Sequence, residues 1–173
     1  MFSEHVVVIL VAIASVAVVA VVGGLVTDVG DWYASLRKPS WNPPNWAFGP
    51  GWTVIFICIA TSGVIAWENA QDDSTRRTLA TLFVINAVLN IAWSPLFFKL
   101  RRPDWSIIEL IPFWLSILAL VIYIATISSQ AALIMLPYLA WVTFAGLLNW
   151  RVVQLNKPFG RQAAMSRGGR PAA

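Results

Sequence analysis

Asn86 and Asn90 are polar residues inside a long apolar stretch, and their spacing could serve a binding site. Residues four apart lie on one face of a helix, and Trp93 follows three positions later on the same side. An amide group in hydrocarbon must find a hydrogen-bond partner, so this face should point into a helix bundle. Two interpretations follow: the amides form interhelical hydrogen bonds, or they contact a bound ligand.

Aromatic residues recur at helical spacing in two other apolar stretches. Trp52 and Phe56 lie four positions apart in the first of them. The stripe in the second, which ends beside Asn149, consists of Pro137, Trp141, Ala145 and Leu148. A tryptophan stripe by itself is more typical of packing. Combined with the two asparagines, the stripes predict an aromatic pocket with a few amide groups, which is the usual composition of a ligand cavity.

Groups that could carry acid–base, nucleophilic or metal chemistry are scarce. Glu109 is a functional candidate because a carboxylate inside a membrane is costly, although pairing with a nearby basic group or snorkelling is the favoured interpretation. The single histidine, His5, and the single cysteine, Cys58, exclude a metal site built from several imidazoles or thiolates. The chain contains no hydrolase, zinc-protease, P-loop or dinucleotide motif. We therefore expect no firm catalytic residue and no metal site.

The composition is that of an integral membrane protein. Of the 173 residues, 58% are hydrophobic and only 12% are charged, whereas a soluble domain carries about 25% charged residues. A membrane span needs about 20 mostly apolar residues. Five stretches reach that length, and they cover residues 6–26, 46–67, 78–98, 105–127 and 131–155. The predicted fold class is an all-α integral membrane protein, a five-transmembrane-helix bundle in one domain, residues 1–155.

The segment from Asp31 to Asn45, which joins the first two spans, is rich in tryptophan and proline. Proline fixes φ and removes a hydrogen-bond donor, so the segment cannot be one continuous helix and should be an ordered loop. Asn42 is the predicted cap of the following helix, with Pro43 at its first position. Two interpretations of the aromatic residues stay open, an interfacial belt and a lid over a binding site.

Basic residues orient the five spans, whose odd number places the two termini on opposite sides. Of the 12 Lys and Arg residues, only Arg76 and Arg77 fall on the side of the N-terminus. The positive-inside rule therefore places the N-terminus outside and the C-terminus in the cytoplasm, as in a bacterial cell membrane. The basic tail, residues 156–173, is expected to be disordered. Neither this tail nor the net charge of +4 indicates a nucleic-acid partner.

Three motifs together resemble one membrane-protein family. The first is W-Y-A-S-L-R-K-P-S-W-N-P-P at residues 32–44, followed by G-P-G-W at 49–52. The second is N-x-x-x-N-x-x-W-S-P-L-F-F at 86–98, and the third is P-Y-L-A-W-V-T-F-A-G-L-L-N at 137–149. In this order, across residues 6–155, they resemble the TspO/MBR family of bacterial tryptophan-rich sensory proteins and mitochondrial translocator proteins. The resemblance implies a five-helix bundle, commonly a homodimer, that binds porphyrins.

The resemblance also implies a pocket beneath the segment between the first two spans. Its wall would consist of Tyr33, Pro43, Trp52, Phe56, Asn90, Trp93, Trp141, Ala145 and Leu148, with Asn86 close by. Trp52 and Trp141 correspond to the pair that the family is thought to use in porphyrin chemistry. The chain departs from the family at Phe56, where tyrosine is common. Trp150 replaces the tyrosine of a cholesterol motif proposed for animal members, so we do not expect cholesterol binding.

A porphyrin suits such a pocket, because its flat ring could stack on Trp52 and Trp141 while its propionates reach Arg37 or Lys38. With no His, Cys or Met ligand evident there, we expect metal-free protoporphyrin IX to bind in preference to tightly ligated haem. The protein itself should need no cofactor. A membrane-embedded porphyrin sensor is the favoured function. Light- or oxidant-dependent porphyrin degradation, and transport of porphyrin or another lipophilic metabolite, remain alternatives.

Overall fold

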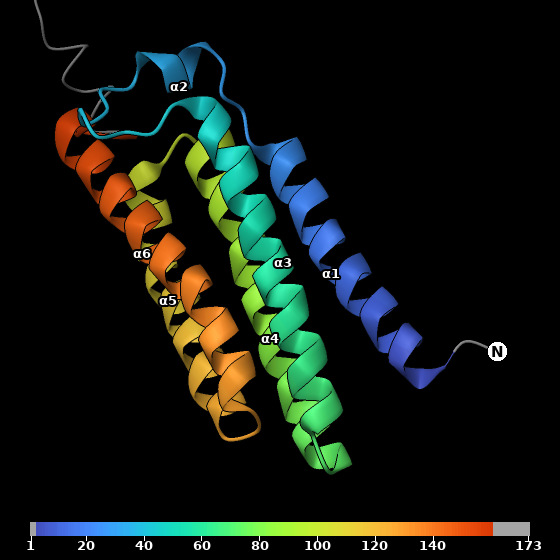
Figure 1. Ribbon diagram of the computed structural model, residues 1–173. Helices are drawn as coiled ribbons and strands as arrows, with labels where there is room; N and C mark the ends of the chain where they lie inside the picture. Colours follow the sequence, from blue (N-terminus) through green and yellow to red (C-terminus); the bar gives the residue numbers. More distant parts are fainter. Residues whose placement is uncertain (1–2, 161–173) are drawn as a thin grey trace, which may run out of the picture.

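Five long helices form a bundle in the computed structural model, which describes residues 3–160 (Figure 1). They are α1 (Glu4–Val26), α3 (Asn45–Asn69), α4 (Asp73–Ser94), α5 (Pro103–Ala125) and α6 (Ser129–Asn156). A short helix, α2 (Asp31–Ser35), lies between α1 and α3, and a π-helical turn, η1 (Pro95–Lys99), extends α4. Residues 3–160 contain no strand, and the five long helices are apolar enough to cross a membrane. The predicted five-helix membrane bundle is confirmed.

Polar caps mark where several of the helices begin. The Asp72 carboxylate accepts hydrogen bonds from the Thr75 backbone N–H at 2.9 Å and from the Thr75 hydroxyl at 2.7 Å. The Ser128 hydroxyl accepts from the Ala131 N–H at 3.3 Å, and Pro103 occupies the first turn of α5. Because a cap is polar, α4 begins before the apolar run that predicts the span from residue 78.

The start of α3 differs from the prediction. The sequence predicts Asn42 as the cap and Pro43 as the first helical residue, but α3 begins at Asn45, with Pro44 as its cap. A residue that precedes a proline is disfavoured in the α region, so Pro44 keeps Pro43 out of the helix. The Asn42 amide instead donates to the Pro43 carbonyl oxygen at 2.7 Å.

The segment between α1 and α3 is ordered, and it contains α2, which the sequence does not predict. Asn156, the last residue of α6, holds this segment to the bundle. Its Oδ1 accepts from the Arg37 N–H at 2.8 Å, and its Nδ2 donates to the Arg37 carbonyl oxygen at 2.7 Å. Asn156 thus belongs to a helix and not to the predicted tail. Residues 161–173 of that tail lie outside the described part of the chain.

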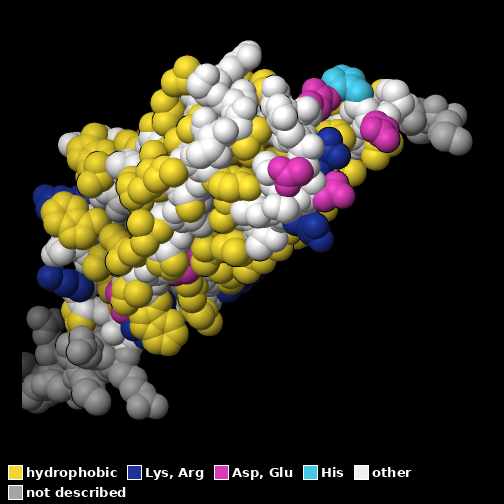
Figure 2. Space-filling view, turned by 90° about the horizontal axis from the view of Figure 1, so that it is seen from below, with side chains coloured by type: hydrophobic (Ala, Val, Ile, Leu, Met, Phe, Trp, Pro, Cys, Tyr) yellow, Lys and Arg dark blue, Asp and Glu magenta, His cyan; other side chains and the backbone are white. Residues whose placement is uncertain are grey.

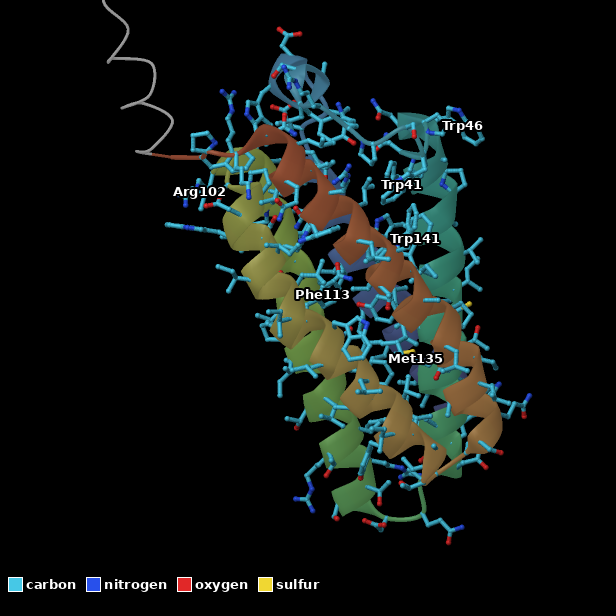
Figure 3. All side chains as sticks on the ribbon, turned by 90° about the vertical axis from the view of Figure 1, so that its left-hand side faces the viewer. Trp41, Trp46, Arg102, Phe113, Met135 and Trp141 are labelled. Carbon is cyan, nitrogen blue, oxygen red and sulfur yellow. The ribbon has the colours of Figure 1, made fainter. Side chains whose placement is uncertain are left out.

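The hydrophobic core lies between α3, α4, α5 and α6. Ile117, Leu120 and Met135 are completely buried, and Figure 3 shows Met135 between α5 and α6. By contrast, Val19 is the only buried residue of α1. This helix leans away from the others toward its N-terminus (Figure 1). It therefore acts as a loosely packed wall of the bundle.

Candidate functional site

A cavity of about 470 Å³ lies within the bundle beneath the α2 segment, and we call it the α2-side cavity. Its volume falls in the range of small-molecule sites, about 300–1,000 Å³. Eight of the predicted wall residues line it, although they come from four separate elements, α2, α3, α4 and α6. They are Tyr33, Trp52, Phe56, Asn90, Trp93, Trp141, Ala145 and Leu148. That these residues bind a ligand stays a prediction.

The cavity wall is built from aromatic rings in contact with one another. The Trp52 ring meets the Trp141 ring edge to face, with centroids 6.1 Å apart, and stacks on Phe56 at 5.5 Å. On the α4 side, Trp93 stacks on Phe97 at 5.0 Å. Such pairs stabilise their own geometry by about 0.5–1.5 kcal/mol each beyond the area that they bury. The rings therefore form a fixed surface for a flat ligand.

Gly51 allows the Trp141 ring its position, a role that nothing in the sequence indicates beyond the G-P-G-W motif. A Cβ atom at Gly51 would lie 2.9 Å from Cζ2 of the Trp141 ring. The absence of a side chain lets the indole of α6 approach the backbone of α3 directly. In Figure 3, Trp141 lies below Trp41, which belongs to the segment that covers the cavity.

The two predicted asparagines make interhelical hydrogen bonds, as the first of the two interpretations predicts. The buried Tyr138 hydroxyl donates to Asn86 Oδ1 at 3.1 Å and accepts from Asn90 Nδ2 at 2.9 Å. Asn86 Nδ2 also donates to the Ser116 hydroxyl at 2.8 Å. Tyr138 was not among the predicted site residues, although it is the second residue of the third motif. Asn86 consequently lies outside the α2-side cavity, whereas Asn90 lines it.

Three buried polar atoms of the cavity lining have no hydrogen-bond partner among residues 3–160. They are the indole Nε1 atoms of Trp93 and Trp141, and Oδ1 of Asn42. An unpaired buried donor or acceptor costs about 1–3 kcal/mol. The lining thus offers two donors and one acceptor to a ligand.

The residues that line the cavity carry no formal charge at neutral pH. They include no His, Cys, Met, acidic or basic residue, and Tyr33 is the only titratable one. Burial raises the pKa of the Tyr33 phenol above its usual value, so it stays neutral. Nor does the described part of the chain contain any group of three His, Cys, Asp or Glu residues that could hold a metal ion. The lining therefore suits an apolar ring that carries no metal ion, because it offers no charged group and no His, Cys or Met side chain to coordinate one.

Three predicted ligand contacts lie in the covering segment but outside the lining: Pro43, Arg37 and Lys38. Pro43 is displaced because it belongs to the extended stretch before α3. The Lys38 ammonium donates to the carbonyl oxygens of Tyr33, at 2.5 Å, and Leu36, at 3.2 Å. It also lies 4.2 Å from the centroid of the Tyr33 ring, and partial burial lowers its pKa. The Arg37 side chain is exposed.

The position of Glu109 contradicts the favoured prediction that its carboxylate pairs with a basic group or snorkels to the membrane surface. Both of its carboxylate oxygens are buried, and neither has a hydrogen-bond partner in residues 3–160, so the side chain neither pairs nor snorkels. Arg102, the basic residue nearest to Glu109 along the chain, is already engaged. Arg102 donates to Asp104 at 2.8 and 2.5 Å and stacks on Trp105 at 4.2 Å.

Comparison with known proteins agrees with this architecture. The family model of the TspO/MBR family matches residues 10–155. The chain is 36% identical over 125 residues to the tryptophan-rich protein TspO of Chlorobaculum tepidum, covering 72% of this chain and 79% of that protein. It is 41% identical over 130 residues to the protein of the same name from Archaeoglobus fulgidus, covering 75% and 82%.

An animal protein is similar over the same region. The chain is 35% identical over 127 residues to the translocator protein of Bos taurus, covering 73% of this chain and 75% of that protein. The family match includes part or all of each of the five long helices. It also includes every residue that lines the α2-side cavity. The chain is an integral membrane protein that belongs to the TspO/MBR family.

Proposed function

We propose that the α2-side cavity binds a porphyrin and that the protein acts as a membrane-embedded sensor of tetrapyrroles. The observation that carries the proposal is the Trp52–Trp141 pair, whose rings meet at 6.1 Å in an uncharged cavity. A large flat ring gains most from such a wall, because aromatic surfaces bury much area in defined geometries. Family membership supports a sensor or translocator role in the membrane.

The polar groups support a metal-free porphyrin. The unpaired Nε1 atoms of Trp93 and Trp141 can each donate a hydrogen bond to an acidic or carbonyl group of the ligand. Haem iron would need a His, Cys, Met or Tyr axial ligand, and Tyr33 is the only such residue in the lining. Of the two predicted propionate contacts, Arg37 is the better candidate, because the Lys38 ammonium already binds two carbonyl groups.

The test is a titration of the full chain in detergent with protoporphyrin IX, followed by tryptophan fluorescence. We expect saturable quenching, and we expect Trp52→Phe and Trp141→Phe each to weaken binding about tenfold, as loss of a stacking contact would. Trp150→Phe is the matched control, because Trp150 lies on α6 but is half exposed and outside the lining. Linear quenching that is the same in all four proteins would mean partitioning into detergent and would remove the proposal.

Light- or oxidant-dependent porphyrin breakdown is the second candidate, and the contact between Trp52 and Trp141 favours it, since adjacent indoles can supply electrons. Dioxygen would be the oxidant. Illumination of the same samples in air should then produce a new absorption band that is missing in either Phe variant. If the spectrum in air and light matches the spectrum in the dark, binding without breakdown is the function.

We also propose that the protein is a homodimer and that the α2-side cavity faces the cytoplasm. Of the nine Lys and Arg residues in positions 3–160, seven belong to the end of the bundle that carries α2 and the end of α6, which supports this orientation. A cysteine placed at exposed Ser40 should resist an impermeant maleimide in intact cells, whereas one at exposed Ser74 should react. The reverse pattern would invert the assignment.

A further inference from the structure

A second and larger cavity, of about 850 Å³, lies at the opposite end of the bundle between α1, α3 and α4. We call it the N-terminal-side groove. Val19, Phe56 and Asn90 line both cavities and mark the level where they meet. The groove lies beside the part of α1 that leans away from the bundle (Figure 1). Nothing in the porphyrin proposal uses it.

The groove has the length of one membrane leaflet. Both Glu4 and Val19 line it, and the α1 wall between them rises about 22 Å at 1.5 Å per residue. Half of a bilayer, headgroups included, measures about 20–22 Å. Its walls between the two ends are mainly aliphatic, and small residues such as Ala12 and Gly63 leave room between the helices. A chain of hydrocarbon from the neighbouring leaflet fits this shape.

The mouth of the groove carries charges of both signs. The Arg76 guanidinium lies 5.9 Å from the Trp67 ring, and its Nε is buried with no hydrogen-bond partner in the described chain. Glu4 also lines the mouth, and His5 Nδ1 contacts the Glu68 carboxylate across it, which joins α1 to α3. Figure 2 shows acidic side chains, basic side chains and the histidine gathered at this end.

We propose that the N-terminal-side groove binds a zwitterionic phospholipid of the phosphatidylethanolamine type from the adjacent leaflet. The phosphate accepts hydrogen bonds from Arg76, the ammonium group faces Glu4, and one acyl chain lies along the apolar walls of α1, α3 and α4. An anionic headgroup has no partner for Glu4, and a free phosphate leaves the apolar walls without a ligand. The mixed charges of the mouth therefore select the lipid class.

Native mass spectrometry of the full chain, titrated in detergent with dioleoyl phosphatidylethanolamine, tests the headgroup contact. We expect Arg76→Gln to weaken lipid binding about tenfold, because it removes a charge-assisted hydrogen bond. Arg77→Gln is the matched control, since Arg77 is exposed and does not line the groove. Equal affinity in the wild type and both variants would show that the retained lipid is nonspecific and would overturn the proposal.

A second pair of variants tests the acyl-chain site without touching a charge. Ala12→Phe places a ring in the groove and should weaken binding about tenfold or more. Ala14→Phe puts the same ring on the exposed face of α1 and should leave binding unchanged. Circular dichroism and gel filtration verify that each variant is folded. Unchanged binding in Ala12→Phe, or a dimer that excludes lipid from the groove, would overturn the assignment.

The lipid class is tested by repeating the titration with dioleoyl phosphatidylglycerol, which has no ammonium group. We expect weaker binding of this lipid than of phosphatidylethanolamine, with the preference reduced about threefold by Glu4→Gln. If phosphatidylglycerol binds as tightly as phosphatidylethanolamine, the zwitterionic assignment is wrong.

Discussion

The two cavities of this bundle meet at Phe56 and Asn90, yet they are built in opposite ways. The α2-side cavity has a wall of interlocked aromatic rings, an uncharged lining and a segment held over it by Asn156. The N-terminal-side groove has mainly aliphatic walls, a charged mouth and one side formed by the loosely packed α1. Rigid rings select a ligand by shape, whereas a hydrocarbon groove accepts a flexible chain and must select by its headgroup.

The boundary between the two cavities is a polar network. Tyr138 joins Asn86, which lines the N-terminal-side groove, to Asn90, which lines both. Hydrogen-bonded side chains in a low-dielectric interior hold a defined geometry because breaking them leaves unpaired groups. The network thus fixes the geometry of the boundary between the two cavities.

The largest expected effect comes from Gly51→Ala, which would affect only the α2-side cavity. The added Cβ collides with Trp141, so we expect the free energy of unfolding to fall by about 1–3 kcal/mol and protoporphyrin binding to weaken. Thermal denaturation and fluorescence titration measure the two effects. Gly49→Ala is the control for the stability measurement, because a Cβ there meets no atom within 4 Å. If Gly51→Ala weakened porphyrin and phospholipid binding equally, the two cavities would not be independent sites.

Tyr138→Phe should affect both cavities, because it removes the hydroxyl between the two asparagines. We expect the free energy of unfolding to fall by roughly 1 kcal/mol and both ligands to bind more weakly. Tyr123→Phe is the control, since the Tyr123 hydroxyl makes only a long contact of 3.5 Å to the Thr75 carbonyl oxygen. A loss confined to one ligand would show that Tyr138 supports that site alone.

The smallest effect is expected from Asn156→Ala, which releases the segment over the α2-side cavity. Two hydrogen bonds to the Arg37 backbone disappear, and the global loss of stability should stay below about 1 kcal/mol because the site is near the surface. Hydrogen exchange should become faster in residues 31–44 and stay unchanged in α1. Gln154→Ala, on the exposed side of α6, is the control. Unchanged exchange in residues 31–44 would mean that other contacts hold the segment.

Much of the architecture can be predicted from local features of the chain. Hydropathy and length identify the five spans, and the four-residue spacing of Asn86 and Asn90 predicts a polar face inside the bundle. The start of α3 differs from its prediction because Pro44 disfavours the helical conformation at Pro43, an effect that the Pro-Pro pair itself encodes. Such properties depend on a few neighbouring residues, so the sequence contains them.

The sites themselves depend on distances between helices. Only the folded chain shows that Tyr138 joins the asparagines, that Gly51 admits the Trp141 ring, and that Glu109 lies buried without a partner. The same holds for the groove, since the outward lean of α1 is not a property of its apolar sequence.

The sequence alone therefore determined that this protein is a five-span membrane bundle with an aromatic segment between its first two spans. The tertiary structure decided that two cavities exist and which residues face them. The physical reason is that hydrophobic length specifies whether a helix enters the membrane, whereas packing between helices specifies the space left among them.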